Sequence, residues 1–204
     1  DTMPELRQNL ATKEWVIIAH ERARRPDEFR NNRDSKPAAP QRKDDCPFCP
    51  GNEKKTDEPT YVLGAMPNWR VRSIPNRYPA LIPSPGTHKP KQSLYRSLPG
   101  EGIHEVIIDG PRHDQHPAIM DPKQMRDMIY VYQERFRASL QNNKVALTML
   151  FKNHGESAGT SLEHPHSQLI GSCVVPSHVR HRMDEAQKYY DQNGVCVFCR
   201  MVEE

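Results

Sequence analysis

Residues 153–169, NHGESAGTSLEHPHSQL, contain the side chains of this chain that are best suited to chemistry. His164 and His166 flank a proline, and Gln168 follows them. On an extended strand, alternate residues face the same way at a spacing of about 6.6 Å, so these three side chains are expected to share one pocket wall. Pro165 weakens a regular strand, and a local rule broken beside two histidines indicates a functional site.

The residues just before the two histidines are small and polar. Asn153 and Ser161 offer side-chain donors, and small residues let backbone N–H groups come close to an anion. The small residues are Gly155, Ala158 and Gly159. This composition predicts a phosphate cradle, although the G-K-[ST] of a P-loop is absent. A neutral imidazole beside such a cradle could attack an α-phosphorus, and at pH 7 roughly three quarters of an unperturbed histidine is neutral.

A C-x-x-C pair at residues 46–49, CPFC, places two thiols on one tight turn. Such a pair can ligate zinc or act as a redox couple. The polar, proline- and glycine-bearing segment that follows favours zinc, because a redox pair is expected where a strand meets a helix. His164 and His166 are candidates for the two further ligands, and so is His113, for which a solvated loop histidine is the simpler interpretation.

Three hypotheses for residues 153–169 therefore stay open at this point. The histidines could act on a bound phosphate. They could instead complete a closed two-cysteine, two-histidine zinc site with Cys46 and Cys49, without catalysis. The segment could also be a hydrogen-bonded loop that holds no ion.

The bulk composition narrows the classes of function. The chain has 204 residues, a formal net charge of +3, 35% hydrophobic residues and a mean hydropathy of −0.86. This small charge does not predict binding to a nucleic acid polymer. No apolar run approaches the ~20 residues that span a membrane, and the N-terminal residues lack an apolar signal core, so a cytoplasmic protein is expected. Four of the five cysteines form C-x-x-C pairs, which favours metal over disulfides.

The pattern of elements predicts an α+β fold. A long helix is expected over residues 121–141, capped by Asp121, with Pro122 in its first turn. Its apolar stripe comprises Met125, Met128, Ile129, Tyr132, Phe136 and Leu140. Strands are expected at residues 15–19, 69–75, 104–109, 145–151 (buried) and 166–175, and a short polar helix at 178–192. Because strands and helices do not alternate regularly, an antiparallel sheet with the long helix on one face is predicted.

The C-x-x-C motif recurs as CVFC at residues 196–199. Since the first pair stands near the start of a unit, we expect two parts: a domain over residues 1–192 and the start of a second, truncated domain at 193–204. Cys196 and Cys199 would then begin a possible second metal site.

Residues 153–168 resemble the signature of the galactose-1-phosphate uridylyltransferase family, a branch of the histidine-triad (HIT) superfamily in which glutamine replaces the third histidine. Further similar blocks are RARRP, CPFCPGNE, PNRYPAL and GPRH, in that order. The resemblance covers nearly the whole chain, as the N-terminal half of the family. It implies a HIT-like antiparallel sheet (a half-barrel) with a long helix on one face. One departure is Asn76-Arg77-Tyr78-Pro79, where well-known members carry Asn-Asp-Phe-Pro.

The resemblance also implies roles for individual residues. His166 would be the nucleophile that carries the nucleoside monophosphate, and Gln168 would hydrogen-bond the phosphoryl oxygens. A structural zinc would be held by Cys46, Cys49, His113 and His164. Nucleotide and phosphate contacts would come from Arg22, Arg25, Asn76, Phe151, Asn153, Gly159 and Ser161.

The expected activity is that of a nucleotidyltransferase in galactose and carbohydrate metabolism. It would exchange hexose-1-phosphates on a UDP-sugar such as UDP-glucose through a nucleotidyl-histidine, with no organic cofactor, and would be a homodimer at full length. One alternative is an ADP-sugar or dinucleoside polyphosphate phosphorylase or hydrolase on the same scaffold. A second alternative is a zinc-stabilised binding module without catalysis.

Overall fold

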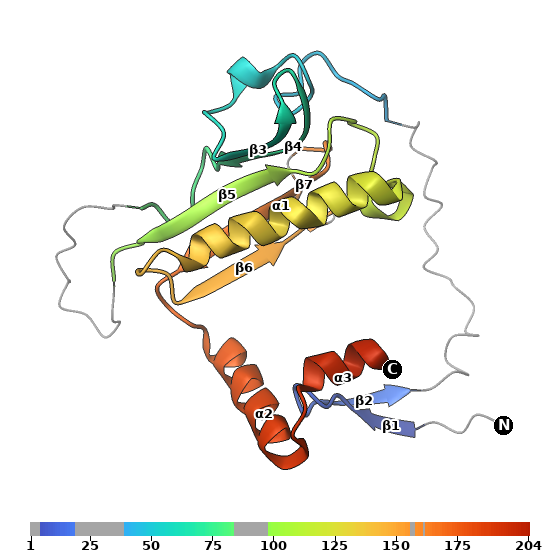
Figure 1. The fold of residues 1–204 in the computed structure, drawn as a ribbon, viewed down its shortest axis with the longest axis vertical. Coiled ribbons are helices and arrows are strands. Elements are labelled where there is room, and N and C mark those ends of the chain that lie inside the picture. The colour runs from blue at the N-terminus through green and yellow to red at the C-terminus, as the bar shows by residue number, and fades with distance from the viewer. Residues whose placement is uncertain (1–4, 19–38, 84–97, 156–157, 161) are drawn as a thin grey trace. The chain divides into compact units, whose positions relative to one another are not determined.

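The computed structural model describes residues 5–18, 39–83, 98–155, 158–160 and 162–204 (Figure 1). The chain divides into two compact units. The larger unit spans Pro37–Val174 and contains the candidate site, while the smaller unit joins Asp1–Lys36 to Val175–Glu204. None of the helices within the described ranges is long and apolar enough to cross a membrane.

The larger unit is built on a five-stranded antiparallel sheet with the order β3-β4-β5-β7-β6. Its strands are β3 (Tyr61–Ala65), β4 (Asn68–Pro75), β5 (Gly102–Ile108), β6 (Leu147–Phe151) and β7 (His166–Ser172). One long helix, α1 (Pro122–Leu140), packs against this sheet (Figure 1). The predicted α+β fold is therefore confirmed, although β3 was not expected from the sequence.

Helix α1 begins where its sequence signals place it. The Asp121 carboxylate accepts hydrogen bonds from the backbone N–H groups of Lys123 (2.9 Å) and Gln124 (3.0 Å), and Pro122 occupies the first turn. These bonds satisfy amide groups that have no partner inside the helix. The expected apolar stripe is wider than the buried face, because Ile129 and Leu140 remain 44% and 56% exposed.

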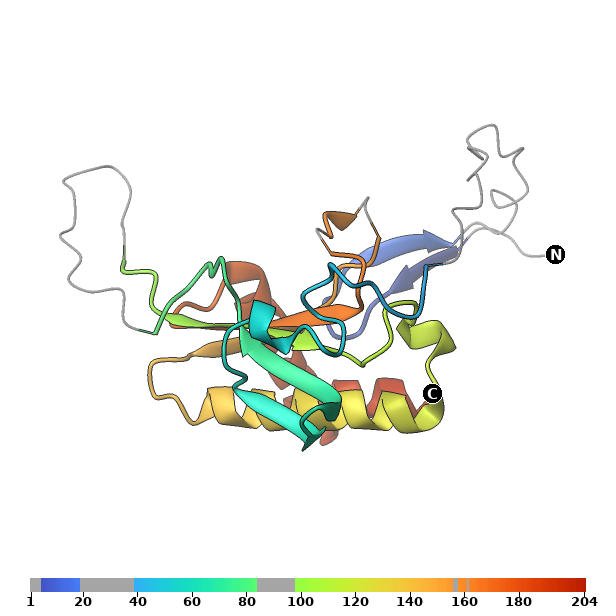
Figure 2. The same ribbon diagram turned by 90° about the horizontal axis from the view of Figure 1, so that it is seen from above.

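The two faces of the sheet carry separate apolar clusters. On the helix side, Met128 and Val131 of α1 pack with Val71, Ile107 and Leu169. On the other side lies a cluster formed by Cys46, Phe48, Cys49, Trp69, Ile74, Val106 and Ile108. In Figure 2, α1 runs along one face of the sheet, and the turn that carries the C-x-x-C pair lies away from it. Because strand side chains alternate, β5 contributes to both sides, with Ile107 in the first cluster and Val106 and Ile108 in the second.

A buried ion pair attaches α1 to the centre of the sheet. The Arg135 guanidinium donates to both carboxylate oxygens of Glu105 on β5, at 2.8 and 2.7 Å. Ser73 on β4 donates to the same carboxylate at 2.9 Å. A bidentate arginine with a further hydroxyl donor leaves this buried charge well compensated.

Strand β6 differs from its prediction. Residues 145–151 were expected to form a buried strand, but β6 lies at the edge of the sheet and, among the described strands, pairs with β7 alone. Its side chains at Met149 and Leu150 are each 36% exposed. An apolar run of this length indicates a strand but does not distinguish an edge position from a central one.

The smaller unit contains β1 (Glu5–Gln8), β2 (Trp15–Ile18), α2 (Ser177–Asn193) and α3 (Val197–Glu203). The predicted strand at 15–19 and helix at 178–192 correspond to β2 and α2. The second C-x-x-C pair starts α3, and Cys199 is exposed. The division of the chain into domains at residues 192 and 193 stays a prediction.

Candidate active site and metal-binding cluster

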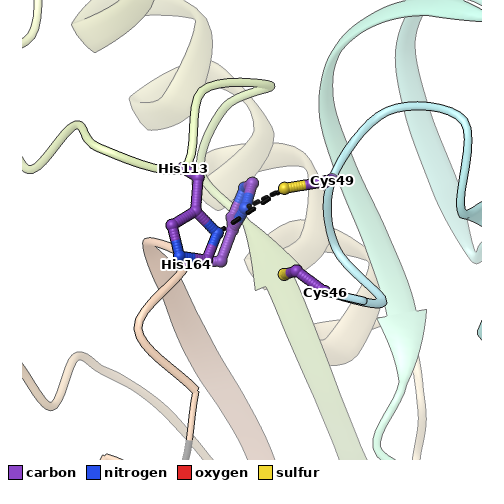
Figure 3. Close-up of side chains that lie close together, drawn as sticks. All are labelled: Cys46, Cys49, His113 and His164. Carbon is purple, nitrogen blue, oxygen red and sulfur yellow. Dashed lines mark hydrogen bonds between the residues drawn. The ribbon is translucent and has the colours of Figure 1, made fainter. Parts of the chain in front are cut away.

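Four buried side chains, Cys46, Cys49, His113 and His164, meet at one point of the larger unit (Figure 3). One ligand atom from each lies within 4.8 Å of the other three. The Nδ1 atoms of His113 and His164 each lie 3.5 Å from the Cys49 sulfur. Two thiols and two imidazoles in such an arrangement are the donor set of a closed, tetrahedral metal site.

Hydrogen bonds around this cluster fix the direction of its ligands. The Nε2 of His164 lies 2.9 Å from the Gly110 carbonyl, which can only accept, so Nε2 carries the proton and Nδ1 is left with its lone pair. The backbone N–H of Lys43 donates to the Cys49 sulfur at 3.3 Å, and the Asn52 amide donates to the Cys46 carbonyl at 2.7 Å. Bonds of this kind orient metal ligands.

Burial also makes the cluster suitable for a cation. It raises the pKa of the Cys46 thiol and lowers the pKa of His164 to about 4. A bare thiolate or an imidazolium is therefore unfavourable at this position, whereas a divalent cation would stabilise two thiolates beside neutral rings. These four residues could therefore hold a metal ion.

The prediction that His164, His166 and Gln168 share one pocket wall is confirmed for His166 and Gln168 and wrong for His164. Strand β7 begins only at His166, after Pro165, which has no backbone N–H for the ladder. His164 is fully buried in the cluster, whereas His166 and Gln168 line a neighbouring cavity. One hypothesis from the sequence was a closed zinc site formed by Cys46, Cys49, His164 and His166. In the structure, His113 takes the place of His166 in the group of four.

The cavity has a volume of about 500 Å³ and is bordered by the C-x-x-C turn and the segment after it, by the end of β4, the middle of β5 and the start of β7. Its described lining is Pro47, Phe48, Lys55, Thr56, Asp57, Ile74, Pro75, Asn76, Arg77, Tyr78, His104, Val106, Leu162, His166 and Gln168. Apolar walls with a few convergent polar and charged groups are typical of a small-molecule site.

A hydrogen bond to a nearby backbone carbonyl orients the ring of His166. Its Nδ1 lies 2.8 Å from the His164 carbonyl, so Nδ1–H donates there and the lone pair remains on Nε2. The Phe48 ring packs edge-on at 5.5 Å between centroids. Burial lowers the pKa of His166, which favours the neutral ring. The arrangement suits a nucleophile or a general base.

A buried polar network connects the start of β7 to helix α1. Lys152 donates to Asp109 at 2.6 Å and to the His166 carbonyl at 2.9 Å. Tyr132 of α1 donates to Asp109 at 2.8 Å and lies 2.5 Å from the Ser167 hydroxyl, and burial raises the pKa of Tyr132. Helix α1 and the backbone of His166 are thus joined through one fully buried carboxylate.

Only some of the residues that were predicted to contact the nucleotide and its phosphates lie at the cavity. Asn76 lines it together with His166 and Gln168. Phe151 pairs with Gln168 at the end of β6, while Asn153 and Gly159 are exposed and do not belong to the described lining. Gly159 has a φ of +77°, a conformation that favours glycine. The remaining three predictions, Arg22, Arg25 and Ser161, lie outside the described residues.

Several lining residues were not identified from the sequence: Lys55, Asp57, Arg77, Tyr78 and His104. The residues at 77 and 78 belong to a block that had been singled out for its departure from a family pattern. His104 gave a weaker signal, because only the pairing of β5 with β7 brings it beside Gln168. Within the described residues, Cys196 and Cys199 belong to no group of three or more ligands, so the second metal site stays a prediction.

Comparison with known proteins supports the similarity seen in the motifs. Residues 1–176 match the family model described as galactose-1-phosphate uridyl transferase, N-terminal domain. An ADP-glucose phosphorylase from Arabidopsis thaliana is 35% identical and covers 96% of this chain. A galactose-1-phosphate uridylyltransferase from Thermotoga maritima is 28% identical over 98% of the chain. The chain spans 56% and 57% of the lengths of these two relatives.

Solved structures give the same result for the fold. The crystal structure of the Arabidopsis thaliana ADP-glucose phosphorylase with bound ADP-glucose has a TM-score of 0.73 and 32% identity, covering 98% of this chain and 58% of that one. A uridylyltransferase structure has a TM-score of 0.63 and 27% identity, covering 99% of this chain and 56% of that one. The expected HIT-like fold is therefore confirmed.

Proposed function

Because the chain belongs to the galactose-1-phosphate uridyl transferase family, we propose that it transfers a nucleotidyl group from a nucleoside diphosphate sugar through His166. The observation that carries this proposal is the hydrogen bond from His166 Nδ1–H to the His164 carbonyl, which leaves the Nε2 lone pair on a ring that lines the cavity. The neighbouring cluster of four buried ligands does not include this ring.

The reaction proceeds in two displacements. His166 Nε2 attacks the α-phosphorus, the bond from this phosphorus to the bridging oxygen breaks, and the sugar 1-phosphate leaves. The nucleoside monophosphate is then bonded to Nε2. A phosphate oxygen of the second substrate attacks the same phosphorus, the N–P bond breaks, and the neutral ring returns. Gln168 hydrogen-bonds the phosphoryl oxygens, where negative charge increases in both transition states.

The metal of this proposal is a structural zinc at Cys46, Cys49, His113 and His164. The donor set fits zinc, since two sulfurs and two ring nitrogens are its preferred ligands in closed sites. Bound zinc would stabilise the turn that carries Phe48, and Phe48 contacts His166. The ion has no part in the displacements, which take place on His166.

Two pairs of substrates are compatible with this chemistry. Similarity favours ADP-glucose with inorganic phosphate as acceptor, because the relative described as ADP-glucose phosphorylase shares 35% identity and the Thermotoga maritima uridylyltransferase 28%. The second candidate is a UDP-sugar with hexose-1-phosphate as acceptor. It is favoured by the family to which the chain belongs. Both candidates require the same nucleotidyl-histidine.

The test is to incubate the protein with ADP-glucose or UDP-glucose labelled at the α-phosphorus and then to denature it. We expect acid-labile, alkali-stable label on His166, and the nucleotide that labels faster identifies the base. His166→Ala should show only background label. His178→Ala is the matched control, because His178 is exposed on α2 and should leave labelling unchanged. Absence of label from both nucleotides would contradict the proposal.

A further inference from the structure

Two backbone amides determine how the side chains around Gln168 share their protons. The N–H of Ala80 donates to Nδ1 of His104 at 2.9 Å. A backbone N–H can only donate, so Nδ1 is an acceptor, and in the neutral imidazole the proton must reside on Nε2. Nε2–H then donates to the Oε1 of Gln168 at 2.8 Å.

Asn76 is fixed in the same manner. Its Oδ1 accepts from the backbone N–H of Tyr78 at 2.9 Å, so its other terminal atom, Nδ2, is the amide nitrogen. Nδ2 lies 3.3 Å from the Oε1 of Gln168 and donates to it. The two donor nitrogens of Asn76 and His104 are 3.0 Å apart because they converge on one acceptor.

The Gln168 carboxamide therefore has only one favourable orientation. If it were turned over, its NH2 group would face two donors and both hydrogen bonds would be lost. In the orientation observed, the oxygen is occupied by His104 and Asn76, and the NH2 group remains as a donor. All three side chains line the cavity together with His166.

We propose that His104 is a positioning residue that holds the Gln168 carboxamide with its NH2 group toward the phosphoryl group on His166. This inference rests on the proposed function. Strand pairing explains the contact, since Val106 is opposite Gln168 and His104 is opposite Ile170, which makes His104 the diagonal neighbour of Gln168. A preorganised donor stabilises charge that develops on phosphoryl oxygens, whereas an inverted amide would present its oxygen to the same charge.

A pair of variants tests the role of the Nε2–H donor. The amide nitrogen of a glutamine at position 104 reaches the place of the imidazole Nε2, so His104→Gln keeps a donor that His104→Leu removes. We expect His104→Leu to slow nucleotidylation of His166, measured in a single turnover, by about 10-fold or more, while His104→Gln stays within about 3-fold of wild type. Equal rates in the leucine variant and the wild type would overturn the inference.

A double-mutant cycle separates positioning from a general structural effect. Gln168→Leu removes the amide on which His104 acts, so adding His104→Leu should slow this variant no further. Multiplying effects would show that His104 acts elsewhere and would overturn the inference. Metal content and thermal midpoint, measured on every variant, report whether the fold is preserved.

Nitrogen-15 NMR of the His104 ring gives a readout that does not depend on turnover. The Nε2–H tautomer is expected, and a proton on Nδ1 would overturn the inference even if labelling succeeds. Absence of label in the wild type would instead contradict the proposed function, and the two failures are thus distinguishable.

Discussion

The cluster of Cys46, Cys49, His113 and His164 and the cavity are adjacent, and both include a histidine of the H-P-H segment, yet they are built differently. The cluster has four ligands that come from three separate segments, and all four are buried. The cavity is open, and its lining mixes apolar walls with polar groups from strands and loops. His164 therefore belongs to the cluster and His166 to the cavity, although only Pro165 separates them in the sequence.

The difference shows what each region requires of the chain. A closed metal site needs specific ligand atoms at fixed distances, and it tolerates little variation. A substrate cavity needs one reactive atom in the right orientation, while the rest of its lining can vary with the ligand. The three predictions below test this contrast, beginning with the largest effect.

Replacing either histidine should give opposite results. His164→Ala removes a metal ligand, so we expect loss of the metal and a decrease of several kcal/mol in the free energy of unfolding, because metal binding contributes to folding. His166→Ala should retain one metal per cluster with nearly unchanged stability. Metal analysis and denaturant unfolding of the two variants provide the measurement. If His166→Ala lost its metal, the His166 ring of the wild type would be a ligand of the cluster, and the two histidines would not have separate roles.

Asp109 should be more important for stability than a partly exposed carboxylate. Asp109→Ala leaves Lys152 without its buried partner and removes an acceptor from Tyr132, so a loss of about 3 kcal/mol is expected. Glu134→Ala is the matched control, since Glu134 pairs with the exposed Arg137 on α1 and should cost under about 1 kcal/mol. Urea unfolding measures both variants, and equal losses would contradict a supporting role for the buried network.

The smallest effect is expected at the N-terminus of α1, where Asp121 belongs neither to the cluster nor to the described lining of the cavity. Asp121→Ala removes the side chain that caps α1, which should lower the free energy of unfolding by about 1 kcal/mol. Metal content and labelling of His166 should stay unchanged. Asp121→Asn serves as the control, because asparagine caps nearly as well. If the alanine variant also lost metal, the cluster would depend on the helix more than its contacts indicate.

The sequence predicted elements better than it predicted how side chains are grouped. Helix α1 was predicted because its cap and apolar spacing are local signals. The position of β6 at an edge was missed, since an apolar run does not report its neighbours. The C-x-x-C pair indicated a metal site and His113 was one candidate ligand, but it lies 64 residues from Cys49, and only the resemblance to a family favoured it over the other histidines. His104 was missed because strand register, which depends on long-range pairing, brings it to Gln168.

The ring of Phe48 contacts both histidines: its centroid lies 6.1 Å from the centroid of the His164 ring and 5.5 Å from that of the His166 ring. A change of side chain there would disturb His164 and His166 at once. Tyr78, in contrast, is 86% exposed at the rim of the cavity. A new substrate preference is therefore more easily acquired at the rim, where a substitution affects the incoming molecule alone, than at this shared wall.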